Sequence, residues 1–550
     1  MHTSQLALHD ISKRYGDHLV LDKVSFTVKP GEKVGVIGDN GAGKSTLLRL
    51  IAGEEHGDDG ELSVVAPGGT GYLAQALSLP PDATVQDAVD ASLADLRALE
   101  ARIRRAEADL AGAEGARLDA DLQAYSALLE QYEARDGHHA DGRVDIALHG
   151  LGVPQLERDR PLVTLSGGER SRLALAATLA AQPELLLLDE PTNDLDDQAT
   201  AWLEALLRQY HGTVIAVTHD RVFLEQLTAT VLEVEAGTVT RYGDGYDGYL
   251  AAKAAERRRR IQKYEDWHDE LARNRRLAES NVARLDAIPR KTPLSVFGHG
   301  GFRARGRGHG AMVRIRNAKE RLARLTREPV EPPPTPLVLS ARITTAEVAG
   351  EPPEAAEDAS EPVPAAELTD VFVADRLRVP SLRVRPGERL LVTGPNGVGK
   401  TTLMKVLAGE LRPDTGRVRV PGRVGHLRQD QTPWPPGLTV VQAFARGRTG
   451  TLDEHTDLLL SLGLFTPADL RLRVEELSYG QRRRIELAGL VSQPVDLLLL
   501  DEPTNHLSPA LVEELEEALT DYRGALVIAT HDRMMRSRFT GSHLDLTTVA

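Results

Sequence analysis

The chain has 550 residues, of which 41% are hydrophobic and 27% are charged, and its formal net charge is −15 at pH 7. This length exceeds what one hydrophobic core usually supports, so we expect two large domains and a connector, and the absence of cysteine excludes disulfides, iron–sulfur clusters and thiolate zinc sites. Neither a run of 18 apolar residues nor the apolar stretch of a secretory signal occurs, which excludes a membrane-spanning helix and favours a cytoplasmic location.

The first motif along the chain is a glycine-rich loop, GDNGAGKST, between an apolar strand-like run and a helix-like run. It matches the P-loop pattern Gly-x-x-x-x-Gly-Lys-Ser/Thr, in which backbone N–H groups surround phosphate. Lys44 can reach the terminal phosphates of a nucleotide, and Ser45 can bind magnesium. The predicted nucleotide-binding residues of this loop are Gly38, Asp39, Asn40, Gly41, Ala42, Gly43, Lys44, Ser45 and Thr46.

A helical pair is predicted at about residues 90–140. Gln75 and Ser166 are 91 positions apart, whereas their counterparts Gln429 and Ser478 are 49 apart, so about 42 residues are inserted in the first half of the chain. The insertion is either a binding arm or a decoration without a partner. Its apolar positions follow helical spacing, with intervals of three, four or seven residues, at Leu93, Leu96, Ile103 and Leu110 and then at Leu122, Tyr125, Leu129 and Tyr132.

An acidic strand end follows in LLLLDEPTNDLDD. Asp189 suits magnesium binding, and Glu190 suits the polarisation of an attacking water. The alternative for an isolated motif of this kind is a solvated strand end. Further along, AVTHDR contains His219, and an isolated histidine is more often structural than catalytic.

A basic connector separates the two halves. Leu250 to Arg327 holds 21 Lys or Arg and 8 Asp or Glu, an excess of 13 positive charges, so the rest of the chain carries a net charge of −28. Apolar residues at helical spacing predict one helix over Leu250–Leu285, about 50 Å long, and a second helix that includes Met312, Ile315, Leu322 and Leu325. A helical hairpin over 248–328 is therefore expected, and by default such a hairpin is a solvated spacer.

The predicted tip of this hairpin, at about 286–311, is rich in glycine, arginine and proline. Arginines interleaved with aromatic residues suit contacts with phosphates and stacking on RNA bases. An acidic, proline-rich linker over 329–366 follows and marks a domain boundary. The tip residues expected to contact RNA are Arg290, Lys291, Phe297, Phe302, Arg303, Arg305 and Arg307.

The same series of motifs recurs about 350 residues later, which predicts a duplicated domain over 367–550 after a first domain over 1–247. Asp501 and Glu502 repeat the acidic strand end, and His531 repeats His219. Two P-loops in the right context predict an α/β fold with two nucleotide-binding domains. The second loop is expected to bind nucleotide through Gly394, Pro395, Asn396, Gly397, Val398, Gly399, Lys400, Thr401 and Thr402.

Between each P-loop and its acidic strand lie LSGGER and LSYGQR, which resemble the signature of ATP-binding-cassette ATPases. An isolated Ser-Gly-Gly tripeptide usually forms an ordinary turn. The resemblance depends on the order and spacing of all the motifs. It implies ATP hydrolysis with Mg²⁺, with domains packed head to tail so that each P-loop faces the other signature. For nucleotide binding the resemblance implies Tyr15, stacked on adenine, with Gln75, Ser166, Gly167, Gly168, Gln429, Ser478 and Gly480. For metal binding it implies Ser45, Gln75, Asp189, Thr401, Gln429 and Asp501. For catalysis it implies Glu190, Glu502, His219 and His531.

Three positions depart from this pattern. Ser508 replaces Asp196, and Tyr479 interrupts the second signature. An ungapped alignment places Val371 opposite Tyr15, with Phe372 next to it. The two ATP sites are therefore expected to differ.

Two such domains joined by a hairpin resemble the ABC-F proteins, and the whole chain is similar to the antibiotic-resistance members found in antibiotic producers. The resemblance implies a monomer that binds the 70S ribosome at its exit site, contacting ribosomal RNA and P-site tRNA. It would displace a macrolide, lincosamide or streptogramin from the peptidyl-transferase and exit-tunnel region. The alternatives are a drug-independent translation factor of the same family and the ATPase subunit of an antibiotic exporter.

Overall fold

The computed structural model describes residues 5–16, 18–73, 80, 82–110, 116–286, 316–333, 339, 363–374, 376–394, 397–430, 432–505 and 507–548. They form two compact units. The larger unit contains both predicted nucleotide-binding domains except residues 447–471 of the second, which form the smaller unit together with residues 251–336.

The first domain is built on a six-stranded sheet in the order β5-β6-β7-β3-β8-β9, in which only β9 is antiparallel to its neighbour. The β6 and β7 sequences LLLLD and TVIAV are buried at every position, as expected for parallel strands covered on both faces. A smaller antiparallel sheet has the order β2-β1-β4. The strands are β1 (Gln5–Tyr15), β2 (His18–Val28), β3 (Lys33–Gly38), β4 (Asp59–Val65), β5 (Thr70–Leu73), β6 (Leu185–Asp189), β7 (Thr213–Val217), β8 (Thr230–Glu235) and β9 (Thr238–Tyr242).

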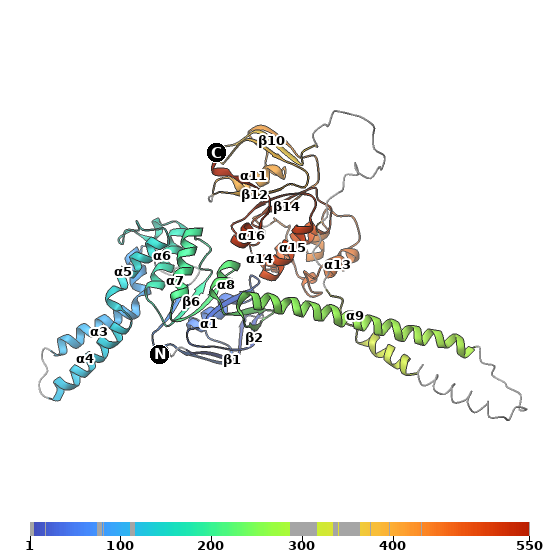
Figure 1. Ribbon diagram of the computed structural model, residues 1–550. Helices are drawn as coiled ribbons and strands as arrows, with labels where there is room; N and C mark the ends of the chain where they lie inside the picture. Colours follow the sequence, from blue (N-terminus) through green and yellow to red (C-terminus); the bar gives the residue numbers. More distant parts are fainter. Residues whose placement is uncertain are drawn as a thin grey trace, which may run out of the picture. The chain divides into compact units, whose positions relative to one another are not determined.

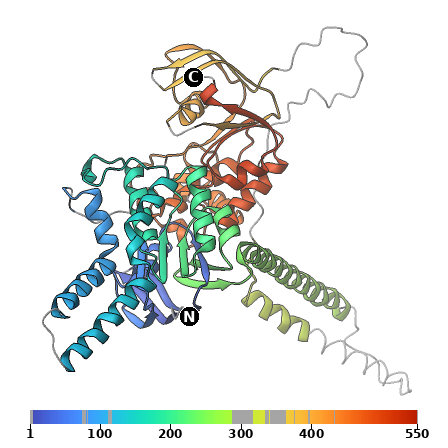
Figure 2. The same ribbon diagram turned by 60° about the vertical axis from the view of Figure 1, so that its left-hand side comes forward.

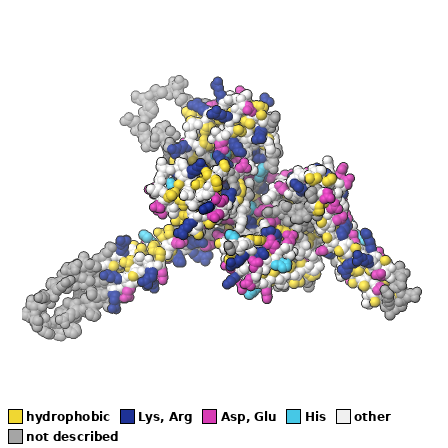
Figure 3. Space-filling view, turned by 180° about the vertical axis from the view of Figure 1, so that it is seen from behind, with side chains coloured by type: hydrophobic (Ala, Val, Ile, Leu, Met, Phe, Trp, Pro, Cys, Tyr) yellow, Lys and Arg dark blue, Asp and Glu magenta, His cyan; other side chains and the backbone are white. Residues whose placement is uncertain are grey.

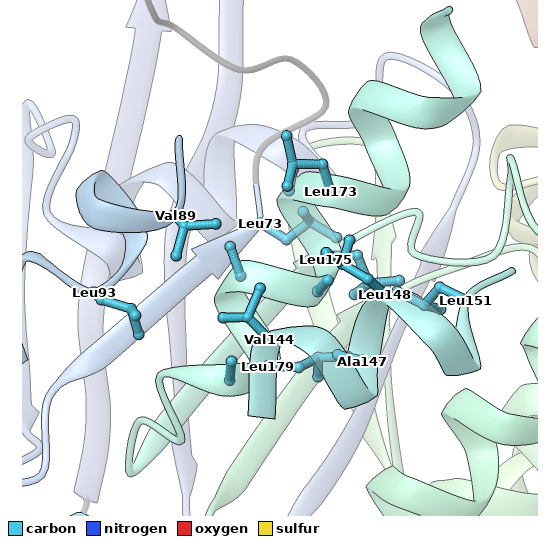
Figure 4. Close-up of a cluster of buried hydrophobic side chains, with 14 of the residues drawn as sticks. Leu73, Val89, Leu93, Val144, Ala147, Leu148, Leu151, Leu173, Leu175 and Leu179 are labelled. Carbon is cyan, nitrogen blue, oxygen red and sulfur yellow. The ribbon is translucent and has the colours of Figure 1, made fainter. Parts of the chain in front are cut away.

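All helices of the first domain except α1, which packs in a separate cluster, contribute to one large core, which Figure 4 shows around Leu73, Leu148 and Leu173. In the region of the predicted insertion, α3 and α4 run side by side (Figure 1 and Figure 2). The helices are α1 (Lys44–Ala52), α2 (Val85–Ser92), α3 (Ala94–Leu110), α4 (Ala116–Ala134), α5 (Ala140–Gly150), α6 (Gly167–Ala180), α7 (Asp197–Gln209) and α8 (Arg221–Leu227).

The second domain repeats this architecture, which confirms the predicted duplication. Its parallel sheet has the order β14-β15-β16-β12-β17, and its antiparallel sheet the order β11-β10-β13. The strands are β10 (Ala366–Val373), β11 (Leu377–Val384), β12 (Arg389–Thr393), β13 (Thr415–Arg419), β14 (Val424–Leu427), β15 (Leu497–Asp501), β16 (Ala525–Ala529) and β17 (Ser542–Asp545). The helices are α11 (Lys400–Leu407), α12 (Val440–Ala445), α13 (Leu452–Ser461), α14 (Tyr479–Val491), α15 (Pro509–Asp521) and α16 (Arg533–Arg538).

The connector contains the predicted long helix as α9 (Gly245–Asp286), and a second helix spans 316–327. The two helices are held together where Trp267 Nε1 donates to the carbonyl of Leu325 at 3.2 Å and Arg321 pairs with Glu270. Lys and Arg side chains lie along the described hairpin (Figure 3). Met312, Ile315 and every predicted tip residue lie outside the described residues. Among the described helices, none has the length and apolarity needed to cross a membrane.

The core of the first domain should be sensitive to cavities. Leu173 is fully buried on α6, so Leu173→Ala is expected to lower the free energy of unfolding by about 2–5 kcal/mol. Leu122 on α4 is 44% exposed and serves as the control, because its truncation leaves no cavity. Thermal unfolding of both variants measures the effect, and equal shifts would contradict the assigned core.

Candidate functional site

Each P-loop connects a buried strand to the first turn of a helix. Gly43 and Gly399 precede α1 and α11 with φ of 106° and 107°, a conformation that side chains other than glycine rarely adopt. A Cβ on Gly399 would lie 2.3 Å from the carbonyl oxygen of Arg376, so the chain has no room for one. Successive backbone N–H groups at the start of a helix form a ready phosphate site. Of the predicted loop residues, only Pro395 and Asn396 lie outside the described residues.

The P-loop lysines fold back onto their own loops. Lys44 Nζ donates to the carbonyls of Gly38 and Asp39 at 2.7 and 3.1 Å, and it lies 3.4 Å from His219 Nε2. Lys400 Nζ donates to the carbonyl of Gly394 at 2.7 Å. Burial lowers the pKa of Lys44. Both ammonium groups therefore lie at the mouth of the loop where phosphate would be expected.

The acidic pairs lie where β6 and β15 end. Glu190 and Glu502 have φ of 51° and 48°, a left-handed backbone that is strained for a residue with a side chain. In both copies the carboxylate lies near the histidine of its own domain: His219 Nε2 is 3.3 Å from Glu190 Oε1, and His531 Nε2 is 3.6 Å from Glu502 Oε1. Burial raises the pKa of both glutamates to about 7.

The histidine loop of the second domain also holds its glutamate through the backbone. The His531 N–H donates to Glu502 Oε2 at 3.1 Å. Burial lowers the pKa of the His531 imidazole, which favours the neutral form of its ring. A neutral ring beside a carboxylate can accept or pass on a proton.

Oxygen atoms that suit a divalent cation converge in the second domain. The Thr401 hydroxyl is 2.9 Å from Gln429 Oε1 and also within hydrogen-bond reach of the Asp501 carboxylate, so its one hydrogen can be donated to either oxygen. Asp501 Oδ2 is buried and has no hydrogen-bond partner among the described residues. Hydroxyl, amide and carboxylate oxygens are hard ligands, so this group fits Mg²⁺. In the first domain Ser45 and Asp189 occupy the matching positions, and Gln75 lies outside the described residues.

Both signature serines cap helices. Ser166 accepts from the N–H of Glu169 at the start of α6, and Ser478 accepts from the N–H of Gln481 at the start of α14, each at 3.2 Å. These helix starts, with Gly167, Gly168 and Gly480, can bind anions. Tyr479, the departure from the signature, donates its hydroxyl to the carbonyl of Gln429 at 2.9 Å and so fastens the second glutamine loop.

The first P-loop lies against the second signature. A Cβ on Gly41 would be 3.4 Å from Ser478 Cβ, and Asp39 forms an ion pair with Arg484 on α14. A cavity of about 1660 Å³ extends between the two sets of motifs. Its lining includes Lys44, Glu190, Gly168, Lys400 and Glu502.

The ungapped alignment of Val371 with Tyr15 was wrong. Val371 is fully buried, whereas Tyr15 is 44% exposed at the end of β1. The N–H of Ala374 donates to Asp414 as the N–H of Arg14 donates to Asp58, so Ala374 is the counterpart of Arg14. The second hairpin is four residues shorter, which an ungapped alignment cannot reveal.

The residue after Ala374 is Asp375, which has no aromatic ring and lies outside the described residues. Phe372 is 41% exposed on β10. The second domain therefore has no aromatic residue at the position of Tyr15. The other departure, Ser508, precedes α15 without a side-chain cap, whereas Asp196 Oδ1 accepts from the N–H of Ala199 at 2.8 Å.

Sequence reasoning missed Arg483. This arginine is 3% exposed and donates to the backbone carbonyls of Asp501 and Glu502 at 3.2 and 3.1 Å, which holds the strained strand end. The sequence Arg482-Arg483-Arg484 looks like a solvated basic run and gives no signal of this burial. Its counterpart in the first domain is Ser171, so this support belongs to the second domain.

The raised glutamate pKa predicts a pH-dependent stability effect. A carboxyl group whose pKa is higher in the folded state loses its stabilising contribution as pH rises from about 4.5 to about 7. Glu502→Gln removes the cost of a buried charge, so its Tm should exceed that of the unchanged chain by an amount that grows between pH 5 and pH 8. At high pH the variant's free energy of unfolding should exceed that of the unchanged chain by about 3 kcal/mol. Thermal scans at several pH values measure it; a gain independent of pH would contradict the buried, titrating carboxyl.

Comparison with known proteins agrees with this geometry. A family model described as ABC transporter matches residues 21–193 and 377–505. The chain is 68% identical over 545 residues to the tylosin resistance ATP-binding protein TlrC of Streptomyces fradiae, covering 99% of this chain and 97% of that protein. It is 31% identical over 543 residues to the energy-dependent translational throttle protein EttA of Haemophilus influenzae, covering 96% and 89%. The chain therefore belongs to the ABC-F family of ATP hydrolases, with two ABC-type ATPase domains in one polypeptide.

Proposed function

We propose that this ATPase protects ribosomes from macrolide, lincosamide or streptogramin antibiotics by displacing the drug from the peptidyl-transferase and exit-tunnel region. The main support is the 68% identity, over nearly the whole chain, to a protein named for tylosin resistance. The 31% identity to a protein named as a translational throttle supports the ribosome as the partner. The proposed place of action is the cytoplasm.

The ATP sites would supply the switch. On nucleotide binding, Lys44 and Lys400 would exchange their loop carbonyls for phosphate oxygens, because a charged acceptor makes the stronger hydrogen bond. The signature helices of the opposite domain would add their N-terminal N–H groups. Mg²⁺, held by Ser45 and Asp189 or by Thr401, Gln429 and Asp501, would neutralise phosphate charge. Glu190 and Glu502, once ionised, would orient the attacking water.

The basic connector would contact the ribosome and so couple the nucleotide state of the two domains to ribosome binding. Its excess of 13 positive charges suits the phosphates of RNA. The predicted tip, 286–311, would then lie toward the drug. Hydrolysis would let the two domains separate and the protein leave.

Because Glu190 and Glu502 must be ionised to act, ATPase activity should rise with pH. Burial raises the pKa of both carboxyl groups to about 7, so kcat/KM for MgATP should increase between pH 6 and pH 8 with a midpoint near 7. Steady-state rates across this range measure the midpoint. A flat profile would mean that neither glutamate limits the reaction.

The function itself is tested with the Glu190→Gln, Glu502→Gln double variant, which should bind ATP without hydrolysing it. We expect it to co-sediment with 70S ribosomes in ATP and to release a labelled macrolide. The control is the Lys44→Ala, Lys400→Ala variant, which loses phosphate contacts and should do neither. Binding without release would replace this proposal with a drug-independent translation factor, and no binding would favour an exporter ATPase.

A further inference from the structure

Two arginines occupy matching positions directly after the histidine loops. Arg221 follows His219 and Asp220 in AVTHDR, and Arg533 follows His531 and Asp532 in IATHDR. Arg221 is only 1% exposed, and it is among the largest fully buried side chains of the described chain. A buried guanidinium is costly unless it is paired, so its partners are informative.

The partners of each arginine come from the other domain. Arg221 contacts Asp532 at 3.0 Å, Glu513 at 2.9 Å and also Glu516. Arg533 contacts Asp220 at 2.8 Å and also Glu204.

These contacts repeat with two-fold symmetry. Arg221 and Arg533, Asp220 and Asp532, and Glu204 and Glu516 are each 312 positions apart, the same separation as Asp189 and Asp501. Each arginine therefore binds the matching pair of carboxylates in the opposite domain, as in an isologous interface. Glu513 is an addition on the Arg221 side, because its counterpart is Ala201.

Each arginine contacts an aspartate in the histidine loop of the other domain. That same loop hydrogen-bonds to the glutamate of its own domain. Asp532 starts α16, where its side chain accepts from the N–H of Met535 and its own N–H donates to Thr530 Oγ1. The preceding residue, His531, donates its N–H to Glu502. In the first domain, Asp220 caps α8 in the same way, and the N–H of His219 hydrogen-bonds to Glu190.

We propose that Arg221 and Arg533 are positioning residues that each fix the histidine loop, and through it the water-orienting glutamate, of the opposite domain. Arg221 acts on Glu502, and Arg533 acts on Glu190. Each glutamate then depends on an arginine of the opposite domain, which acts through the histidine loop. This inference rests on the proposed catalytic role of the two glutamates and is independent of ribosome binding.

The test uses crossed variants of the full chain. The Glu190→Gln background leaves hydrolysis to Glu502, and the Glu502→Gln background leaves it to Glu190. Arg221→Lys keeps the charge but loses the planar fork that contacts several carboxylates. In the Glu190→Gln background it should lower kcat about 10-fold with little change in KM, whereas in the Glu502→Gln background kcat should stay within about twofold. Arg533→Lys should give the reverse pattern.

The matched control is Arg538→Lys. Arg538 pairs with Glu513 and Glu516 within its own domain, and in the described part of the chain it forms no ion pair with Asp532. Arg538→Lys should change kcat by no more than about twofold in either the Glu190→Gln or the Glu502→Gln background. Equal losses in both backgrounds from Arg221→Lys would overturn the proposal, because a general weakening of the interface would act on both sites.

A double-mutant cycle provides the second measurement without the glutamate variants. Asp532→Asn retains an oxygen to cap α16 but loses the charge that Arg221 contacts, so Arg221→Lys and Asp532→Asn should be non-additive in kcat. Additive effects would overturn the coupling. If Glu190→Gln and Glu502→Gln each left ATPase activity unchanged, the catalytic assignment would fail instead, and the arginine inference with it.

Discussion

The strained, buried carboxylate at the end of each central strand is the constraint on which the rest of the site depends. Glu190 and Glu502 combine a left-handed backbone with deep burial, and either feature alone would be unfavourable. They persist because their surroundings fix them: the histidine loop donates N–H groups from one side, and in the second domain Arg483 holds the backbone from the other. A carboxyl group with a pKa of about 7 can gain or lose its proton when the charges around it change, as they would on binding of phosphate and metal.

The buried arginines Arg221 and Arg533 also depend on the presence of both domains. A single domain would leave the guanidinium of Arg221 or Arg533 without the carboxylates that it contacts, which lie in the other copy. Duplication within one polypeptide keeps the two copies at a high effective concentration. It also allows them to diverge, as Arg483 and Ser171 show.

The features that sequence analysis predicted are those set by local pattern. Both P-loops, the inserted pair α3 and α4 and the long helix α9 follow from glycine spacing and apolar periodicity, which are properties of neighbouring residues. The alignment of Val371 failed because a shorter hairpin shifts the register without leaving a motif. The roles of Arg221, Arg483 and Arg533 could not be predicted, because charged residues carry no sign of burial until their partners from distant segments are known.

The two ATP sites differ in ways that reach beyond the adenine position. Asp39 in the first P-loop pairs with Arg484 beside the second signature, but the counterpart of Asp39 is Pro395, which has no charge to offer. The counterpart of Arg484 is Arg172, whose Nε donates to the carbonyl of Asp194 in its own domain. An ion pair at the mouth of one site favours contact between that P-loop and the opposite signature even before nucleotide binds. The other site has no charged residue at the matching loop position, so the two sites differ in this ion pair as well as in the aromatic residue at the position of Tyr15.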